Sequence, residues 1–150
     1  MNHATSFISP VLIAGLIAWG LGQTLKVPIE YWHSRTWNWS LLFSPGGMPS
    51  THSALMSAVT LSIGLFEGFN TPLFALAFAL SMIVMYDATG IRRQAGMHAQ
   101  KINLIINELF SGQAISDKQL KEVLGHSPFQ VTMGTLLGTA IALVTWLIFR

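Results

Sequence analysis

The chain has 150 residues, of which 51% are apolar and only 9% are charged, whereas about 25% are charged in ordinary soluble domains. This composition excludes a disordered chain, a charged coiled coil and most water-soluble enzymes, and the lack of cysteine excludes disulfides and thiolate chemistry. A formal net charge of +2 is too small to indicate a nucleic-acid partner. The composition therefore predicts an integral membrane protein, with residues 1–150 forming a single domain.

Four apolar stretches are candidates for membrane spans, since a helix needs roughly 20 apolar residues to cross a hydrocarbon core of about 30 Å. They cover residues 7–25, 51–66, 72–89 and 130–149. The second stretch is short and rich in small residues, which predicts a place inside the bundle. In the fourth, Gly134 and Gly138 form a GxxxG spacing that favours close helix packing and is compatible with a homodimer.

A more polar segment separates the third and fourth spans. From Met97 to Phe110, apolar and polar residues mix as in an amphipathic helix that lies at the membrane surface, and residues 116–125 predict a short capped helix. We therefore expect an all-α integral membrane protein, a bundle of four transmembrane helices plus an amphipathic interfacial helix between spans 3 and 4.

The basic residues predict the orientation of this bundle. If four spans alternate in direction, one side holds seven of the eight Lys and Arg side chains, namely Lys26, Arg35, Arg92, Arg93, Lys101, Lys118 and Lys121. The positive-inside rule places that side in the cytoplasm. The chain is thus expected in the cytoplasmic membrane, surrounded by membrane lipids, with its polar pocket at the cytoplasmic face.

The first polar cluster precedes the second span. A loop rich in glycine and proline leads directly into a helix start, where unpaired N–H groups and the helix dipole favour an anion. Ser50 and Thr51 add hydroxyl donors, and His52 can donate a proton. The alternative is a helix cap whose histidine only reaches the membrane interface.

The second cluster follows the third span. Asp87 is a functional candidate because ionisable residues are rare at membrane depth, and its alternative role is a structural ion pair. Arg92 and Arg93 offer guanidinium forks suited to phosphate, or they serve only as cytoplasmic anchors. His98 is interpreted as an interfacial histidine and ranks below the candidates of the other clusters.

The third cluster leads into the fourth span, where His126 and Gln130 lie one helical turn apart and can meet. In an alternating bundle all three clusters share one side. A histidine can attack phosphorus to form a phosphohistidine, a second can protonate the leaving oxygen, and arginines can hold the other oxygens. We expect no metal or cofactor, since dense carboxylates for magnesium are missing. A transition-metal site of histidines and Asp87 is the alternative, without a supporting ligand spacing.

Three stretches carry a family resemblance. Pro49-Ser50-Thr51-His52 resembles the Pro-Ser-Gly-His motif of the type 2 phosphatidic acid phosphatases and vanadium haloperoxidases. Together with the segments 84–93 and 124–128, the whole pattern resembles the divergent bacterial and plant membrane branch related to that superfamily.

The resemblance implies roles for individual residues. It implies His52 as general acid, Ser50 and Thr51 as phosphate contacts, and His126 as nucleophile. The acid that orients the nucleophile in the superfamily is replaced by Gln130, which can accept an N–H bond but carries no charge; Asp87 is then the candidate source of charge. The superfamily's opening Lys…Arg-Pro motif lacks its usual form here, with Lys26 and Arg35 as the nearest substitutes.

The function expected from this resemblance is that of a membrane lipid phosphatase. Its substrate would be a lipid phosphomonoester or pyrophosphate, such as phosphatidate, phosphatidylglycerophosphate or a polyprenyl (pyro)phosphate, hydrolysed through a phosphohistidine. The alternative is a non-catalytic protein that binds or transports phospholipid headgroups with a degenerate phosphatase pocket. A third hypothesis is a purely structural membrane subunit.

Overall fold

The computed structural model describes residues 9–43, 46–109 and 125–150, and all regular structure within these ranges is helical. The helices are α1 (Pro10–Ser34), the 3₁₀ turn η1 (Trp39–Leu42), α2 (Thr51–Glu67), α3 (Pro72–Thr89), α4 (Ile91–Leu109) and α5 (Pro128–Phe149). The expected all-α class is confirmed. The short helix expected over residues 116–125 begins in the segment 110–124, which lies outside the described ranges.

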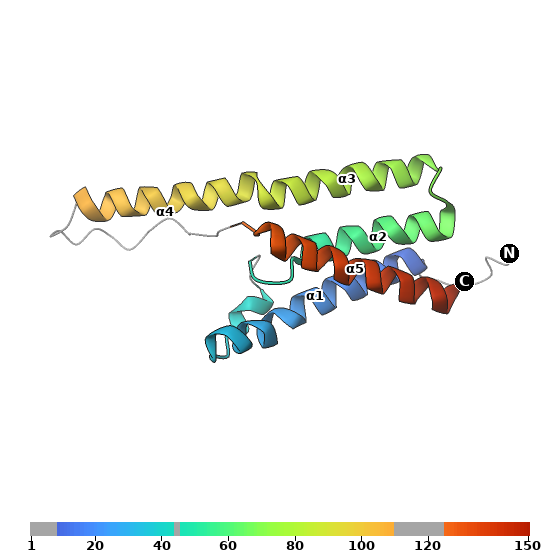
Figure 1. Ribbon diagram of the computed structural model, residues 1–150, viewed down its shortest axis with the longest axis horizontal. Coiled ribbons are helices and arrows are strands. Elements are labelled where there is room, and N and C mark those ends of the chain that lie inside the picture. Colours follow the sequence, from blue (N-terminus) through green and yellow to red (C-terminus); the bar gives the residue numbers. More distant parts are fainter. Residues whose placement is uncertain (1–8, 44–45, 110–124) are drawn as a thin grey trace.

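Helix α2 lies at the centre of the bundle, in contact with α1, α3 and α5. Helices α1 and α3 lie on opposite sides of the α2–α5 pair, and among the described elements they do not touch each other (Figure 1). Helix α5 packs along α2 and also contacts α1 and the edge of α3. The result is a three-layer arrangement in which α2 has protein on most of its surface.

Small residues make this close packing possible. Ala18 of α1 and Ala54 and Ala58 of α2 are completely buried, with Leu137 and Ile141 of α5 packed against them. A Cβ atom on Gly134 would overlap the carbonyl oxygen of Ser50, and one on Gly138 would overlap the carbonyl oxygen of Ala54. The GxxxG spacing of α5 therefore serves helix packing within the chain, as in other close helix pairs in lipid. The homodimer stays a prediction that this contact does not support.

Three helices are long and apolar enough to cross a membrane. They are α1, the rod formed by α3 and α4 as far as Ile106, and α5. Helix α2 has 17 residues and is not among them. The structure thus shows three candidate spans, and the bundle of four spans stays a prediction.

The first helix continues past its expected end at residue 25. The sequence places Lys26 at the end of a span because a charge is costly in lipid, but α1 runs on to Ser34 and contains Pro28. Lys26 extends the inward row of Ala14, Ala18 and Gly22, one residue per helical turn, so its side chain is inside the protein. The fourth expected span also differs slightly, because α5 begins at Pro128 behind its cap at Ser127.

Helix α4 begins at Ile91, before the expected Met97. Only Gly90 separates it from α3, so the two helices form nearly one line and α4 projects beyond the rest of the bundle (Figure 1). Among the described elements it contacts α3 alone. Ile102, Ile105 and Leu109 are exposed whereas Asn103 is buried. A helix over this stretch is confirmed, whereas its role as an amphipathic helix at the membrane surface stays a prediction.

Candidate functional site

Helices α1 and α3 end, and helices α2 and α5 begin, at the same end of the bundle (Figure 1). This is the side on which the sequence places all three polar clusters. The site is built from the starts of α2 and α5, the last turn of α3 and the inner face of α1.

The starts of α2 and α5 are joined directly. The backbone N–H of Ser50 donates to the carbonyl oxygen of Gln130 at 3.0 Å. Ser50 is also the N-cap of α2, since its Oγ accepts from the backbone N–H of Ser53 at 3.4 Å and from the Ser53 hydroxyl at 2.9 Å. Ser50 and Thr51 are buried. The capping interpretation of Ser50 is therefore confirmed, and a phosphate contact would be an additional role.

His126 is 6% exposed and is held from two sides. Its backbone N–H donates to the carbonyl oxygen of Ala88, the neighbour of Asp87 in the last turn of α3, at 3.1 Å. Its Nδ1 lies 3.3 Å from Oε1 of Gln130, which also accepts the backbone N–H of Ser127 at 3.0 Å. The expected meeting of His126 and Gln130 is confirmed, and Asp87, half-buried, is close in sequence to the contact with α3.

His52 has a different environment from His126. Ser50, Ser53 and Ser57 form the row of α2 that faces α5, because they lie against Gly134 and Gly138. At 3.6 residues per turn, His52 points away from that row, and its side chain is exposed although Thr51 and Ser53 on either side are buried. The two histidines therefore lie at the same end of the bundle and differ in burial.

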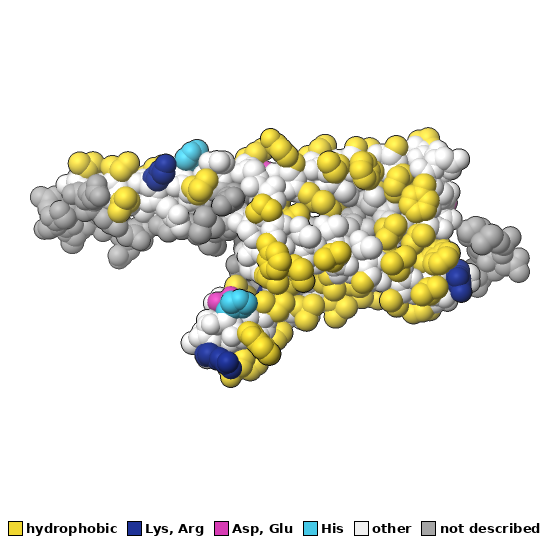
Figure 2. All heavy atoms as spheres, viewed as in Figure 1, with side chains coloured by type: hydrophobic (Ala, Val, Ile, Leu, Met, Phe, Trp, Pro, Cys, Tyr) yellow, Lys and Arg dark blue, Asp and Glu magenta, His cyan; other side chains and the backbone are white. Residues whose placement is uncertain are grey.

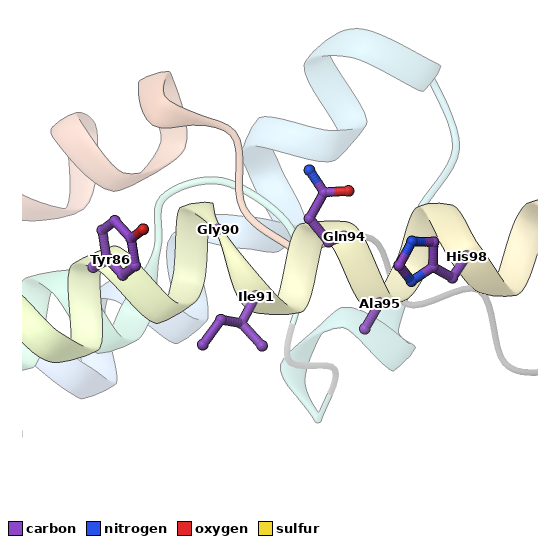
Figure 3. Close-up of a pocket in the computed structure, with 6 residues that line it drawn as sticks. All are labelled: Tyr86, Gly90, Ile91, Gln94, Ala95 and His98. Atoms are coloured by element: carbon purple, nitrogen blue, oxygen red, sulfur yellow. The ribbon is translucent and has the colours of Figure 1, made fainter.

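Arg92 and Arg93 lie in the first turn of α4, and their side chains are outside what the structure describes. A shallow hollow of about 520 Å³ opens at this junction, lined by Tyr86, Gly90, Ile91, Gln94, Ala95 and His98 (Figure 3). Tyr86 and Ile91 are 74% and 65% exposed. All six residues come from the α3–α4 rod, so this hollow is separate from the cluster around Ser50 and His126.

Two residues of α1 also contribute to the cluster. The sequence offered Lys26 only as a substitute for the opening motif of the superfamily, and it did not identify Gln23. Lys26 is 2% exposed and lies beside Gly47. A Cβ atom added to Gly47 would lie 3.5 Å from Cδ of Lys26. Gln23 donates from Nε2 to the carbonyl oxygens of Leu42 at 2.5 Å and Leu41 at 3.3 Å, and its Oε1 accepts from the Thr51 hydroxyl at 2.9 Å. A signal for Lys26 was available in the sequence. Its spacing of four residues after Gly22, which itself follows Ala14 and Ala18 at the same spacing, predicts that all four lie on one face of the helix.

The electrostatic character of this end favours an anion. Two helix starts carry the positive ends of their dipoles, and a buried lysine lies beside the loop that leads into one of them. In the part of the chain that the structure describes, no three His, Asp or Glu side chains come together as metal ligands. This end therefore brings a buried lysine and two helix starts together with a buried imidazole.

Figure 2 shows hydrophobic side chains spread over the visible face of the bundle, while charged side chains lie mainly toward its ends. Such a distribution is typical of a protein whose middle is in contact with lipid. The site thus lies where the apolar surface of the bundle gives way to polar segments.

Comparisons with known proteins agree with these observations. The divergent PAP2 family matches residues 7–141, which include Lys26, Ser50, His126 and Gln130. The uncharacterized membrane protein YuiD of Bacillus subtilis (strain 168) is 42% identical over 144 residues, which are 89% of this chain and 91% of that protein. No solved structure matches the chain significantly. The resemblance found in the sequence is confirmed: this membrane protein belongs to the divergent PAP2 family.

Proposed function

We propose that this protein is a lipid phosphatase of the cytoplasmic membrane, and that it hydrolyses a lipid phosphomonoester or pyrophosphate. The substrate class would include phosphatidate, phosphatidylglycerophosphate and polyprenyl (pyro)phosphates. The observation that carries the proposal is the convergence of Lys26, the start of α2 at Ser50 and Thr51, and the buried His126 at one end of the bundle.

Each part of this cluster suits a step in phosphate-ester hydrolysis. Lys26 and the N–H groups at the two helix starts would bind the phosphate oxygens, with Arg92 and Arg93 as further candidates. His126 would attack phosphorus through Nε2, and the bond to the lipid oxygen would break as that oxygen takes a proton from His52. Water would then attack the phosphohistidine, which releases inorganic phosphate and regenerates His126.

The membrane arrangement belongs to the same proposal. The 17 residues of α2 rise by about 25 Å, close to the hydrocarbon thickness of about 30 Å, and α2 packs lengthwise among the other helices. With α2 as a fourth span, the site end carries seven of the eight basic side chains and faces the cytoplasm. Because α4 continues the line of α3, it would project from the bundle on that same side.

One observation favours a second function. The oxygen that meets His126 belongs to the uncharged amide of Gln130, and replacing a charged orienting partner by an amide can be very costly for catalysis. The second candidate is therefore a protein that binds or transports phospholipid headgroups with this pocket and does not cleave them.

The test is phosphate release by the purified protein in detergent with EDTA, over a panel of lipid phosphates. We expect turnover by the wild type, its loss in His126→Ala and in Lys26→Ala, and its retention in His33→Ala. His33 is a matched control because it is an exposed histidine that contacts its own helix at Ile29.

Other outcomes decide against the proposal in defined ways. A folded wild type that binds these lipids without turnover would favour headgroup binding or transport. Turnover that survives in His126→Ala would contradict the assignment of the nucleophile.

A further inference from the structure

We propose that the hollow at the junction of α3 and α4 is a binding site for one anionic phospholipid, separate from the proposed phosphate site at the starts of α2 and α5. Its apolar side receives the lipid where the acyl chains begin, and its polar side receives the headgroup. The lining, depth and charge of the hollow support this site, and none of them depends on the proposed phosphatase function.

Gly90 lies at the centre of the hollow. Tyr86, Gly90, Gln94 and His98 line it and follow one another at intervals of four residues, so they share one face of the α3–α4 rod. Since glycine has no side chain, this face has a gap between Tyr86 and Gln94 (Figure 3). The volume of about 520 Å³ is within the range of sites that hold small molecules.

The depth of the hollow matches the headgroup layer of a membrane. Helix α3 begins at Pro72, shortly after the exposed polar side chains of Glu67 and Asn70. An upright helix crosses a hydrocarbon core of about 30 Å in roughly 20 residues, so a core that starts at Pro72 ends close to Gly90. Gln94 lies about 6 Å further along the rod, at the level of the headgroups.

The apolar side of the hollow continues the outer surface of α3. Met82, Ile83 and Tyr86 are exposed in the last turns of this helix, and Ile91 is exposed directly after Gly90. The α3–α4 rod is long and apolar enough to cross a membrane, and a tyrosine ring is typical of the interface between lipid and water. Acyl chains that lie along α3 can therefore reach the hollow over a continuous apolar surface.

The polar side of the hollow suits an anionic headgroup. Gln94 and His98 line it from α4 and are exposed, and both can donate hydrogen bonds to a phosphate oxygen. Lys101 is also exposed and follows His98 by three residues, so it lies on the same side of the helix. Basic side chains close to the membrane surface attract anionic lipids. This side should therefore prefer a negatively charged headgroup to a zwitterionic one.

The charges of the surrounding segment have the same sign. Residues 86–109 contain three basic and two acidic side chains, namely Arg92, Arg93, Lys101, Asp87 and Glu108. The six residues that line the hollow include no carboxylate. An anionic headgroup in the hollow would therefore meet donors and a nearby cation, without a negative charge in the lining itself.

The test is native mass spectrometry of the purified full chain in detergent, titrated separately with phosphatidylglycerol, phosphatidylcholine and free glycerol 3-phosphate. We expect one phosphatidylglycerol to bind about fivefold or more tightly than phosphatidylcholine, which is the effect of one cationic side chain near a membrane surface. Glycerol 3-phosphate lacks the acyl chains, so the hollow should not bind it.

Two pairs of variants locate the bound lipid. Ala95→Trp fills the hollow and should weaken the binding of phosphatidylglycerol about fivefold or more, whereas Ala79→Trp, the same change at an exposed position of α3 outside the hollow, should not. Lys101→Gln should reduce the preference for phosphatidylglycerol over phosphatidylcholine. Arg35→Gln removes an exposed charge at the end of α1 and should preserve this preference.

Equal affinity for the two lipids would overturn the proposal, as would unchanged affinity in a folded Ala95→Trp variant or equal weakening in Ala79→Trp. Weaker binding of glycerol 3-phosphate in Ala95→Trp would also contradict it, because the ligand would then be a soluble phosphate. If Ala95→Trp does not fold, a double variant with Gln94→Ala and His98→Ala, both at exposed positions, takes its place. The expected lipid binding in a protein without phosphatase activity would support this site and reject only the proposed function.

Discussion

Helices α2 and α3 have nearly the same length and opposite relations to the bundle. The buried residues of α2 are mostly alanines, serines and threonines, and they occupy more than half of its 17 positions. Helix α3 buries only Ala77, Ser81 and Ala88 and exposes large apolar side chains such as Leu76, Phe78 and Ile83. The polar helix is thus inside, and the apolar one is at the edge.

This difference is what a lipid environment requires. Large apolar side chains are stable against lipid tails, so burying them between helices gains little, whereas small and hydroxyl residues allow close contact and interhelical hydrogen bonds. Several such bonds join α2 to α3. Ser81 contacts the Thr60 hydroxyl at 2.7 Å and the carbonyl oxygen of Met56 at 3.3 Å, and the Thr60 hydroxyl contacts the carbonyl oxygen of Ala77 at 3.2 Å. The polar site at the start of α2 continues this interior to the end of the bundle.

The largest expected effect on the free energy of unfolding comes from a larger side chain at the close contact between α5 and α2. Gly138→Leu would force a side chain against the carbonyl oxygen of Ala54 and the Ser57 hydroxyl, and it should lower the free energy of unfolding by about 3 kcal/mol or more. Ala140→Leu, on the exposed face of the same helix, is the control and should change it little. Unfolding by denaturant in detergent micelles measures both, and equal losses would contradict the packing of α5 on α2.

Removing the hydrogen bonds that join α1 to the site should have an intermediate effect on the free energy of unfolding. Gln23→Leu removes the hydrogen bonds to Thr51, Leu41 and Leu42 and leaves polar groups without these partners, which costs about 1–3 kcal/mol. It should also weaken phosphate binding, because the start of α2 and the loop before it lose their common anchor. Gln94→Leu, at an exposed position, should alter neither stability nor phosphate affinity.

A smaller effect is expected inside the α2–α3 interface. Thr60→Val keeps the shape of the side chain and removes its bonds to Ser81 and the carbonyl oxygen of Ala77. Such bonds average about 0.6 kcal/mol each in a membrane protein, so the loss of two should lower the free energy of unfolding by about 1 kcal/mol. A double-mutant cycle with Ser81→Ala measures the coupling, and strictly additive losses would show that the hydroxyls do not interact.

The smallest effect is expected on the outer face of α3. Leu80 is 46% exposed in the isolated chain, so Leu80→Ala should change the free energy of unfolding by less than about 0.5 kcal/mol. The same unfolding measurement in micelles applies. A loss of several kcal/mol would indicate that another protein surface, and not lipid, covers this face.

The sequence was sufficient where local signals mark a boundary. Helix α3 has its expected limits, because Thr71 caps its start ahead of Pro72 and Gly90 follows its end. It was insufficient for α1, because hydropathy alone treats a lysine as the end of a span. The structure shows that Lys26 continues the inward face of α1, and that the helix extends to Ser34.

In the site, too, the sequence predicted a local contact and did not predict the contacts between distant residues. The distance of one helical turn between His126 and Gln130 is local, and the contact was expected. The bond from Ser50 to Gln130 and that from Thr51 to Gln23 join residues far apart in the chain, and no local pattern specifies them. The exposure of His52, in contrast to the burial of His126, likewise depends on how α2 is placed between its neighbours.

The central claim is that Lys26, the starts of α2 and α5, and His126 form one phosphate-binding site. Calorimetric titration of the purified protein with inorganic phosphate and with orthovanadate, a phosphate mimic, tests it most directly. The account predicts binding by the wild type and by His33→Ala, and at least tenfold weaker binding by Lys26→Ala and His126→Ala. Equal affinity in all four proteins, or no binding to a folded wild type, would contradict it.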